Sequence, residues 1–232
     1  MKTNPRSIFD NAIQKNDIAQ CLIKTAEIHG HYCPGSALGV MASLYGLSKL
    51  KSGSSDGMEK LMAIVENNSC FVDGVQAVSG CTLGNNSLVY RDLGKNAVTF
   101  TNRGKKEGVR IIVRNDFRSV LNKLVPDLFP LMEKVIRDRN GSKEDEAKFK
   151  AKALEASFAM INVPFEELFK FEIVDPLLPS FAPITENVIC EKCGEMIMST
   201  KASTGKDNEV LCRSCAGSRY YEVEGAGIVA KP

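Results

Sequence analysis

The chain has 232 residues, 44% of them hydrophobic, which is enough for one substantial core and a smaller second unit. Its 30 basic and 28 acidic residues nearly balance, which excludes a partner selected by bulk charge alone, such as nucleic acid or an anionic membrane. No stretch approaches the ~20 apolar residues that cross a bilayer, and no apolar run resembles a signal peptide. We therefore expect a soluble, cytoplasmic protein without a membrane partner.

The first predicted element is an amphipathic helix over residues 7–28, which leads into the sequence HGHYCPG. Both histidines of the chain, His29 and His31, fall in this sequence, just before Cys33. The proline after Cys33 suits the first position of a second helix. Cys33 is therefore expected at a helix N-terminus, where backbone N–H groups favour a thiolate or a bound anion.

The middle of the chain is predicted to mix strands with a short helix. Residues 60–66, KLMAIVE, suit a buried strand, and Cys70 follows shortly after it. The sequence VDGVQAVSG favours a brief helix, and Cys81 begins the turn-rich sequence that follows. Two β-rich runs, 97–103 and 108–114, are joined by GKKE and predict a hairpin.

Two further helices are predicted over residues 119–139 and 142–161, joined at Asn140–Gly141, and the first is interrupted at Pro126 and Pro130. Three prolines then mark a linker: Pro176, Pro179 and Pro183. The expected architecture is an α+β core over 1–183, with helices flanking a mainly antiparallel sheet. A small four-cysteine zinc-binding domain of the zinc-ribbon or treble-clef type is expected over 184–232.

The C-terminal segment contains two Cys-x-x-Cys pairs separated by 18 residues: Cys190, Cys193, Cys212 and Cys215. A two-residue spacer lets both thiolates of a pair face one tetrahedral ion, and two pairs complete a closed coordination sphere. The spacing predicts a structural zinc site, because a closed site leaves no position for a substrate. The alternatives are iron in a rubredoxin-like site, two redox pairs, or four unligated thiols.

The N-terminal histidines and cysteine form a second candidate metal site. Alternate residues of an extended segment face the same side, so His29, His31 and Cys33 can present their side chains to one metal ion. Cys70 and Cys81 would join them if the sheet packs against the second helix. The alternative is that the histidines make ordinary hydrogen bonds and the cysteines act as small hydrophobic residues.

The ordered motifs HGHYCPG, CFVDGVQAVSGCTLGNNSL and VTFTNRGKKEGVRI, with the terminal CEKCGE and LCRSC, resemble the FmdE family of formylmethanofuran dehydrogenase components over most of the chain. The resemblance implies an α+β core, frequently an intertwined homodimer, here with a zinc-finger tail. It also implies a His/Cys metal pocket, whose candidates are His29, His31, Cys33, Cys70 and Cys81. One departure is the sequence GNNSL, where the family commonly reads GKGNL, so this loop lacks a lysine.

The family name points to methanogenesis, but members also occur in organisms without it. The named reaction takes place at a molybdenum or tungsten pterin centre with an iron–sulfur relay, which belongs to other subunits. We therefore expect no independent formylmethanofuran dehydrogenase activity from this chain.

The first functional hypothesis is a metal-binding accessory protein. It would hold zinc or another transition metal in the core and structural zinc in the tail, and would act in metal handling or as a partner of a molybdenum or tungsten redox enzyme. The second is a metal-dependent enzyme with an open coordination position for a small substrate. Asp73 and Gln76 would then support the metal ligands or act as acid–base groups, and the alternative is that Asp73 is a solvated cap of the short helix. A closed pocket favours the first hypothesis, and three ligands plus a solvent position favour the second.

Nucleic-acid binding by the tail ranks third among the functional hypotheses. The basic residues of the tail, such as Lys192 and Arg213, are interspersed with acidic residues, such as Glu191 and Glu209. The tail therefore lacks the basic stripe that is typical of proteins that bind phosphate backbones.

Overall fold

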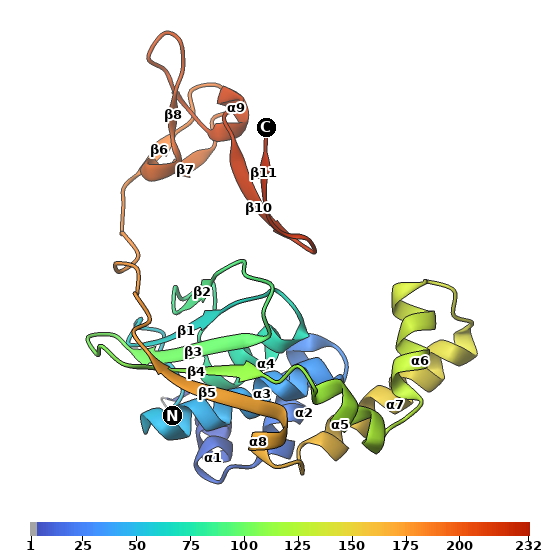
Figure 1. The fold of residues 1–232 in the computed structure, drawn as a ribbon. Helices are drawn as coiled ribbons and strands as arrows, with labels where there is room; N and C mark the ends of the chain where they lie inside the picture. The colour runs from blue at the N-terminus through green and yellow to red at the C-terminus, as the bar shows by residue number, and fades with distance from the viewer. Residues whose placement is uncertain (1–3) are drawn as a thin grey trace. The chain divides into compact units, whose positions relative to one another are not determined.

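The computed structural model describes residues 4–232 and divides the chain within the proline-rich segment. One compact unit ends at Leu178, and the second runs over Pro179–Pro232. The first unit is a five-stranded sheet with helices packed on it, which confirms the predicted α+β class and mainly antiparallel sheet (Figure 1). Within the described residues, no helix is both long and apolar enough to cross a membrane.

The sheet has the strand order β2-β1-β3-β4-β5, and β1–β2 is its one parallel pair within the described residues. The predicted hairpin forms as β3 and β4, with Val98 opposite Ile111. All five residues of β1 are buried, as the apolar run KLMAIVE predicts. The strand bounds are β1 Leu61–Val65, β2 Leu88–Tyr90, β3 Ala97–Asn102, β4 Gly108–Val113 and β5 Phe169–Val174.

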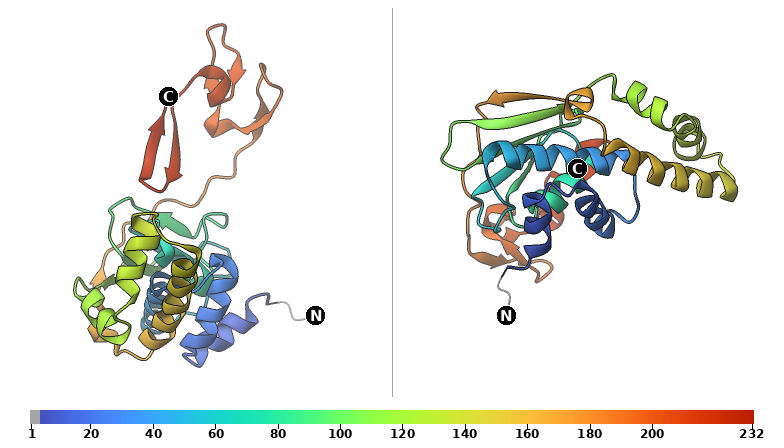
Figure 2. Two further views of the ribbon diagram at one scale, coloured as in Figure 1. Left: turned by 90° about the vertical axis from the view of Figure 1, so that its right-hand side faces the viewer. Right: turned by 90° about the horizontal axis from the view of Figure 1, so that it is seen from below.

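The N-terminal helices lie on one side of the sheet (Figures 1 and 2). The predicted single helix over 7–28 is in fact two helices. Asn16 between them has a φ of 51°, a left-handed conformation that asparagine tolerates, and Asp17 then caps the second helix by accepting a hydrogen bond from the Gln20 N–H. The bounds are α1 Ser7–Gln14, α2 Ile18–His29, α3 Pro34–Leu50 and α4 Cys70–Ser79.

The second group of helices follows β4. The helical pattern over 119–139 breaks at Pro126 as predicted, because Pro126 lacks an N–H and forces Val125 out of the helical conformation, to φ −140° and ψ 82°. The second predicted break, at Pro130, is wrong, because this proline lies in the first turn of the helix Leu128–Met132, where a proline is tolerated. The next helix begins where predicted, with a capping box between Ser142 and Asp145. The bounds are α5 Phe117–Leu124, α6 Leu128–Met132, a π-helix Glu133–Arg137, α7 Lys143–Met160 and α8 Phe165–Leu168.

The unit beginning at Pro179 consists of three two-stranded antiparallel pairs and short helical turns. Only Cys190 and Gly227 are buried among its residues, all of which the structure describes, so it has no apolar core of its own. The bounds are β6 Asn187–Ile189, β7 Met196–Met198, a 3₁₀ turn Ser199–Lys201, β8 Ser203–Thr204, β9 Val210–Leu211, α9 Arg213–Ala216, β10 Tyr220–Glu224 and β11 Gly227–Lys231.

Helix α3 is the centre of the first unit, with eleven of its 17 residues buried, and it packs closely against α4. A Cβ atom added at Gly39 would lie 2.0 Å from the Phe71 carbonyl oxygen, and one added at Gly74 would lie 2.4 Å from the Ser36 carbonyl oxygen. The two helices therefore touch backbone to backbone, which only glycine permits at these positions.

This contact predicts that replacing a helical glycine by alanine lowers the stability of the protein, which is the reverse of the usual effect. Alanine is normally better than glycine inside a helix by about 1 kcal/mol. We nevertheless expect Gly39→Ala to lower the free energy of unfolding by about 2 kcal/mol or more, because the methyl group forces α3 and α4 apart. Urea denaturation measures this change. Gly84→Ala, whose Cβ would meet nothing within 4 Å, is the control, and an unchanged midpoint for Gly39→Ala would contradict the close approach.

Candidate metal centres

Three residues of the first unit form a group that can hold a metal ion. One ligand atom from each of His29, Cys33 and Cys70 lies within 4.8 Å of the others. Ligands bound to one tetrahedral zinc ion, at roughly 2.0–2.3 Å, are separated by about 3.5–3.8 Å, so the group fits such an ion with little adjustment. Each residue marks a helix end, since His29 ends α2, Cys33 caps α3 and Cys70 begins α4.

Cys33 is held by the first turn of α3. The Ser36 N–H donates to the Cys33 Sγ at 3.4 Å, and the Ser36 hydroxyl donates to the Cys33 carbonyl at 2.9 Å. The Cys70 thiol is the main cause that lowers the pKa of Cys33, because its hydrogen bond stabilises the thiolate, and Ser36 and His29 act in the same direction. The Cys33 thiolate in turn raises the pKa of Cys70. The pair therefore provides a sulfur ligand that is readily ionised.

His29 is oriented by Asp73, which lies in the first turn of α4. The His29 Nδ1 is 2.7 Å from Asp73 Oδ2, and the Gln76 amide donates to the other carboxylate oxygen at 3.4 Å. The His29 Nε2 then faces the Cys33 Sγ at 3.4 Å. Burial lowers the pKa of His29, but the hydrogen bond to Asp73 and the neighbouring Cys33 outweigh it and raise the pKa overall. A carboxylate on the far nitrogen is the usual support of a metal-binding histidine.

The other two predicted pocket residues lie outside this group. The exposed His31 has its ring centroid 4.2 Å from that of His29, so it stands beside the group. Cys81 is fully buried and its thiol donates to the Leu61 carbonyl at 3.4 Å. Burial raises the pKa of Cys81 to about 11, which disfavours the thiolate that a metal needs. The structure therefore brings together three of the five core candidates.

A cavity of about 490 Å³ adjoins the three-residue group, and Cys33 and Cys70 form part of its wall. Other lining residues come from α5, α6, the π-helix and α7. Sequence reasoning missed this cavity, because its lining residues come from segments that are far apart in the chain, from His31 to Phe149. The one sequence signal was the spacing of apolar residues over 117–136.

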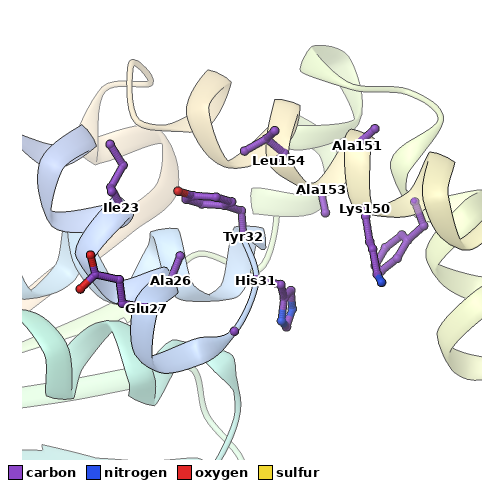
Figure 3. Close-up of a pocket in the computed structure, with 11 residues that line it drawn as sticks. Ile23, Ala26, Glu27, His31, Tyr32, Lys150, Ala151, Ala153 and Leu154 are labelled. Atoms are coloured by element: carbon purple, nitrogen blue, oxygen red, sulfur yellow. The ribbon is translucent and has the colours of Figure 1, made fainter.

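A separate surface groove of about 650 Å³ lies between α2 and α7. Figure 3 shows Ala26 and Glu27 on one side of it and Ala153 and Leu154 on the other, with His31 near the middle. His31 lines both this groove and the cavity beside the metal-binding group. It is thus placed at the rim of the candidate centre.

The four tail cysteines also converge, with all four sulfur atoms within 4.8 Å of one another. The Cys212 N–H donates to the Cys190 Sγ at 3.2 Å, and the Cys215 N–H donates to the Cys212 Sγ at 3.3 Å. The bond from Cys212 is the main cause that lowers the pKa of Cys190. Gly194, directly after the first pair, has a φ of 74°, which the turn at this pair requires. The tail thus presents a closed four-sulfur group.

Comparison with known proteins identifies the first unit further. The family model described as FmdE, molybdenum formylmethanofuran dehydrogenase operon, matches residues 28–170, which include the three-residue group but not the tail cysteines. A crystal structure of an FmdE-like protein of the tungsten formylmethanofuran dehydrogenase type, from Syntrophus aciditrophicus, has the same fold, with a TM-score of 0.55. It is 21% identical over 88% of this chain and 94% of that chain.

A curated relative covers nearly the whole sequence. This protein of Archaeoglobus fulgidus, named a probable S-adenosyl-L-methionine-binding protein, is 44% identical over 226 residues. The match includes 95% of this chain but 59% of the relative, so the chain spans about three fifths of the relative's length.

The contact between Asp73 and His29 predicts an effect on metal affinity. Asp73→Asn keeps the size of the side chain but removes the negative charge that holds the imidazole. We expect it to weaken metal binding at the core centre by about 10-fold or more, measured by competition with a chelator of known affinity. Glu27→Gln is the control, because Glu27 lies on α2 and pairs with Lys24 instead. Equal affinities for the Asp73 and Glu27 variants would show that Asp73 does not support the centre.

The absence of an apolar core in the described tail, residues 179–232, predicts that a bound ion holds this unit together. We expect Cys212→Ser to collapse the amide dispersion of residues 187–231 in a ¹H–¹⁵N spectrum of the full chain, while signals of the first unit remain. Ser214→Ala changes the neighbouring α9 without removing a ligand and serves as the control. A dispersed tail spectrum in Cys212→Ser would argue against a structural ion.

Proposed function

We propose that this chain, which belongs to the FmdE family, holds a transition-metal ion at His29, Cys33 and Cys70 and presents an open coordination position to a small molecule. One observation supports this most: within the described residues, three ligand side chains converge here, and a cavity adjoins two of them. Zinc sites with three protein ligands keep a position for water or substrate, whereas structural sites have four. The ligand count therefore favours a reactive centre over a closed storage site.

Zinc is the metal that we propose for this centre. Two thiolates and an imidazole are ligands that zinc accepts readily in tetrahedral geometry. When bound, the ion would supply Lewis acidity to a ligand in the open position. In this chain Cys33 and Cys70 would balance its two positive charges, and Asp73 would keep the His29 Nε2 directed at it. The proposed enzyme would thus use a neutral centre.

The tail is proposed to bind a second zinc ion in a closed, structural site. This site would shape a surface that contacts a partner, because four cysteine ligands leave no position for chemistry. The partner that we propose is a molybdenum or tungsten redox enzyme, which the family description supports. In this second candidate function the chain is an accessory component of that enzyme, or a protein that handles metal.

A homodimer is a further part of the accessory hypothesis. Phe171 and Ile173 on the edge strand β5 are 45% and 58% exposed, and apolar side chains on a strand at the edge of a sheet suit contact with another chain. S-adenosyl-L-methionine is a candidate small molecule because of the Archaeoglobus relative's name. Since the chain spans about three fifths of that relative, the match does not assign the binding to this part.

Metal content per chain tests the proposed centre. We expect two equivalents in full-length protein purified without metal-affinity resin, measured by mass spectrometry. Cys70→Ala should retain one equivalent because it removes a core ligand, whereas Cys81→Ala should retain two. A metal content in Cys70→Ala equal to that of the unaltered protein would refute the three-ligand centre. Both variants replace a cysteine by alanine, so Cys81→Ala controls for any general effect of losing a thiol.

A further inference from the structure

The cavity beside the core centre has the dimensions and composition of a small-molecule site. Its volume of about 490 Å³ lies within the range of such sites, roughly 300–1,000 Å³. Apolar side chains form most of its wall, and aromatic rings come from several different helices. These apolar residues are Leu38, Phe71, Phe117, Leu121, Leu128, Phe129, Met132, Ile136 and Phe149.

The cavity wall carries one permanent cation, and its two cysteine thiols belong to the metal-binding group. This cation is Arg118, and none of the lining residues, all within the described chain, is Asp or Glu. The Arg118 guanidinium stacks on the Phe129 ring, 4.4 Å from its centroid, so an aromatic wall residue holds the cation. The carboxylate nearest to Arg118 in sequence, Asp116, is bound by Arg114 at 3.0 Å. An anionic group entering the cavity would therefore meet a cation and no competing carboxylate.

We infer that the cavity binds a small molecule with an aromatic or aliphatic body and one anionic group. The body would pack against the rings of α5, α6 and α7, and Arg118 would attract the anionic group. This inference rests on the proposed function, because Cys33 and Cys70 share the cavity wall and a ligand here would lie next to the metal centre. It narrows the substrate class of that centre to small anions with an aromatic or aliphatic body.

Three related probes separate the two features of the ligand. They are 4-phenylbutanoate, its neutral amide and acetate, each titrated into the full-length, zinc-loaded protein by calorimetry. We expect 4-phenylbutanoate to bind at least about 30-fold more tightly than acetate, because acetate lacks the apolar body. We expect the amide to bind about 5-fold more weakly than the acid, because it has no charge for Arg118.

A pair of variants locates the binding. Ile136 lines the cavity and is 43% exposed, so Ile136→Asp places a negative charge there without disturbing a buried position. It should weaken 4-phenylbutanoate binding by about 10-fold. Leu124→Asp on α5 is the matched control, since Leu124 is 40% exposed and outside the cavity wall. Equal loss in both variants, or loss in neither, would place the probe elsewhere and overturn the inference.

The probe comparison and the metal content have separate outcomes. Equal binding of acid and acetate would overturn the apolar part of the inference, and equal binding of acid and amide would overturn the anionic part. Metal content is measured on the same samples. Two equivalents of metal without binding of 4-phenylbutanoate would refute this inference alone. Equal metal content in the unaltered protein and in Cys70→Ala would refute the proposed function, whatever the result with the probes.

Discussion

The backbone contact between α3 and α4 is the constraint on which the core centre depends. Gly39 and Gly74 let the two helices approach until a single methyl group would collide with the opposite backbone. Because Cys33 caps α3 and Cys70 begins α4, the separation of their sulfur atoms is set by this crossing and not by a flexible loop. Tight packing of helices fixes such geometry far better than a loop does, which suits a site for metal binding.

Helix α4 contributes twice to the same centre, through Cys70 and through Asp73 one turn later. The Asp73 carboxylate contacts His29, so the helix that carries the ligand Cys70 also orients the ligand His29. The hydrogen bonds at the centre therefore link the ends of three helices that the apolar core already holds together. An ion would enter a site whose ligands need little rearrangement, and folding, not metal binding, would bear the entropic cost of aligning them.

Features of the site that depend on neighbouring residues could be predicted from the sequence, whereas contacts between distant residues could not. The motifs identified the family and the α+β fold, and Pro34 placed Cys33 at a helix start. The alternation of His29, His31 and Cys33 suggested an extended segment, but α2 continues to His29 and turns at Gly30, with a φ of 81°. Which cysteine meets Cys33 depends on helix packing, so the predicted pocket also included the buried Cys81. The cavity was missed for the same reason.

The two metal-binding groups lie in units that differ in their source of stability. The group in the first unit lies on a large apolar core, which includes Leu22, Phe71 and Phe100, so that unit has a source of stability independent of any ion. Its ion can therefore have an incomplete ligand set and exchange one position. The tail buries only Cys190 and Gly227 within its described residues 179–232, so an ion held by its four cysteines would take the place of the missing core. The proposed number of ligands in each group thus agrees with whether its unit has an apolar core of its own.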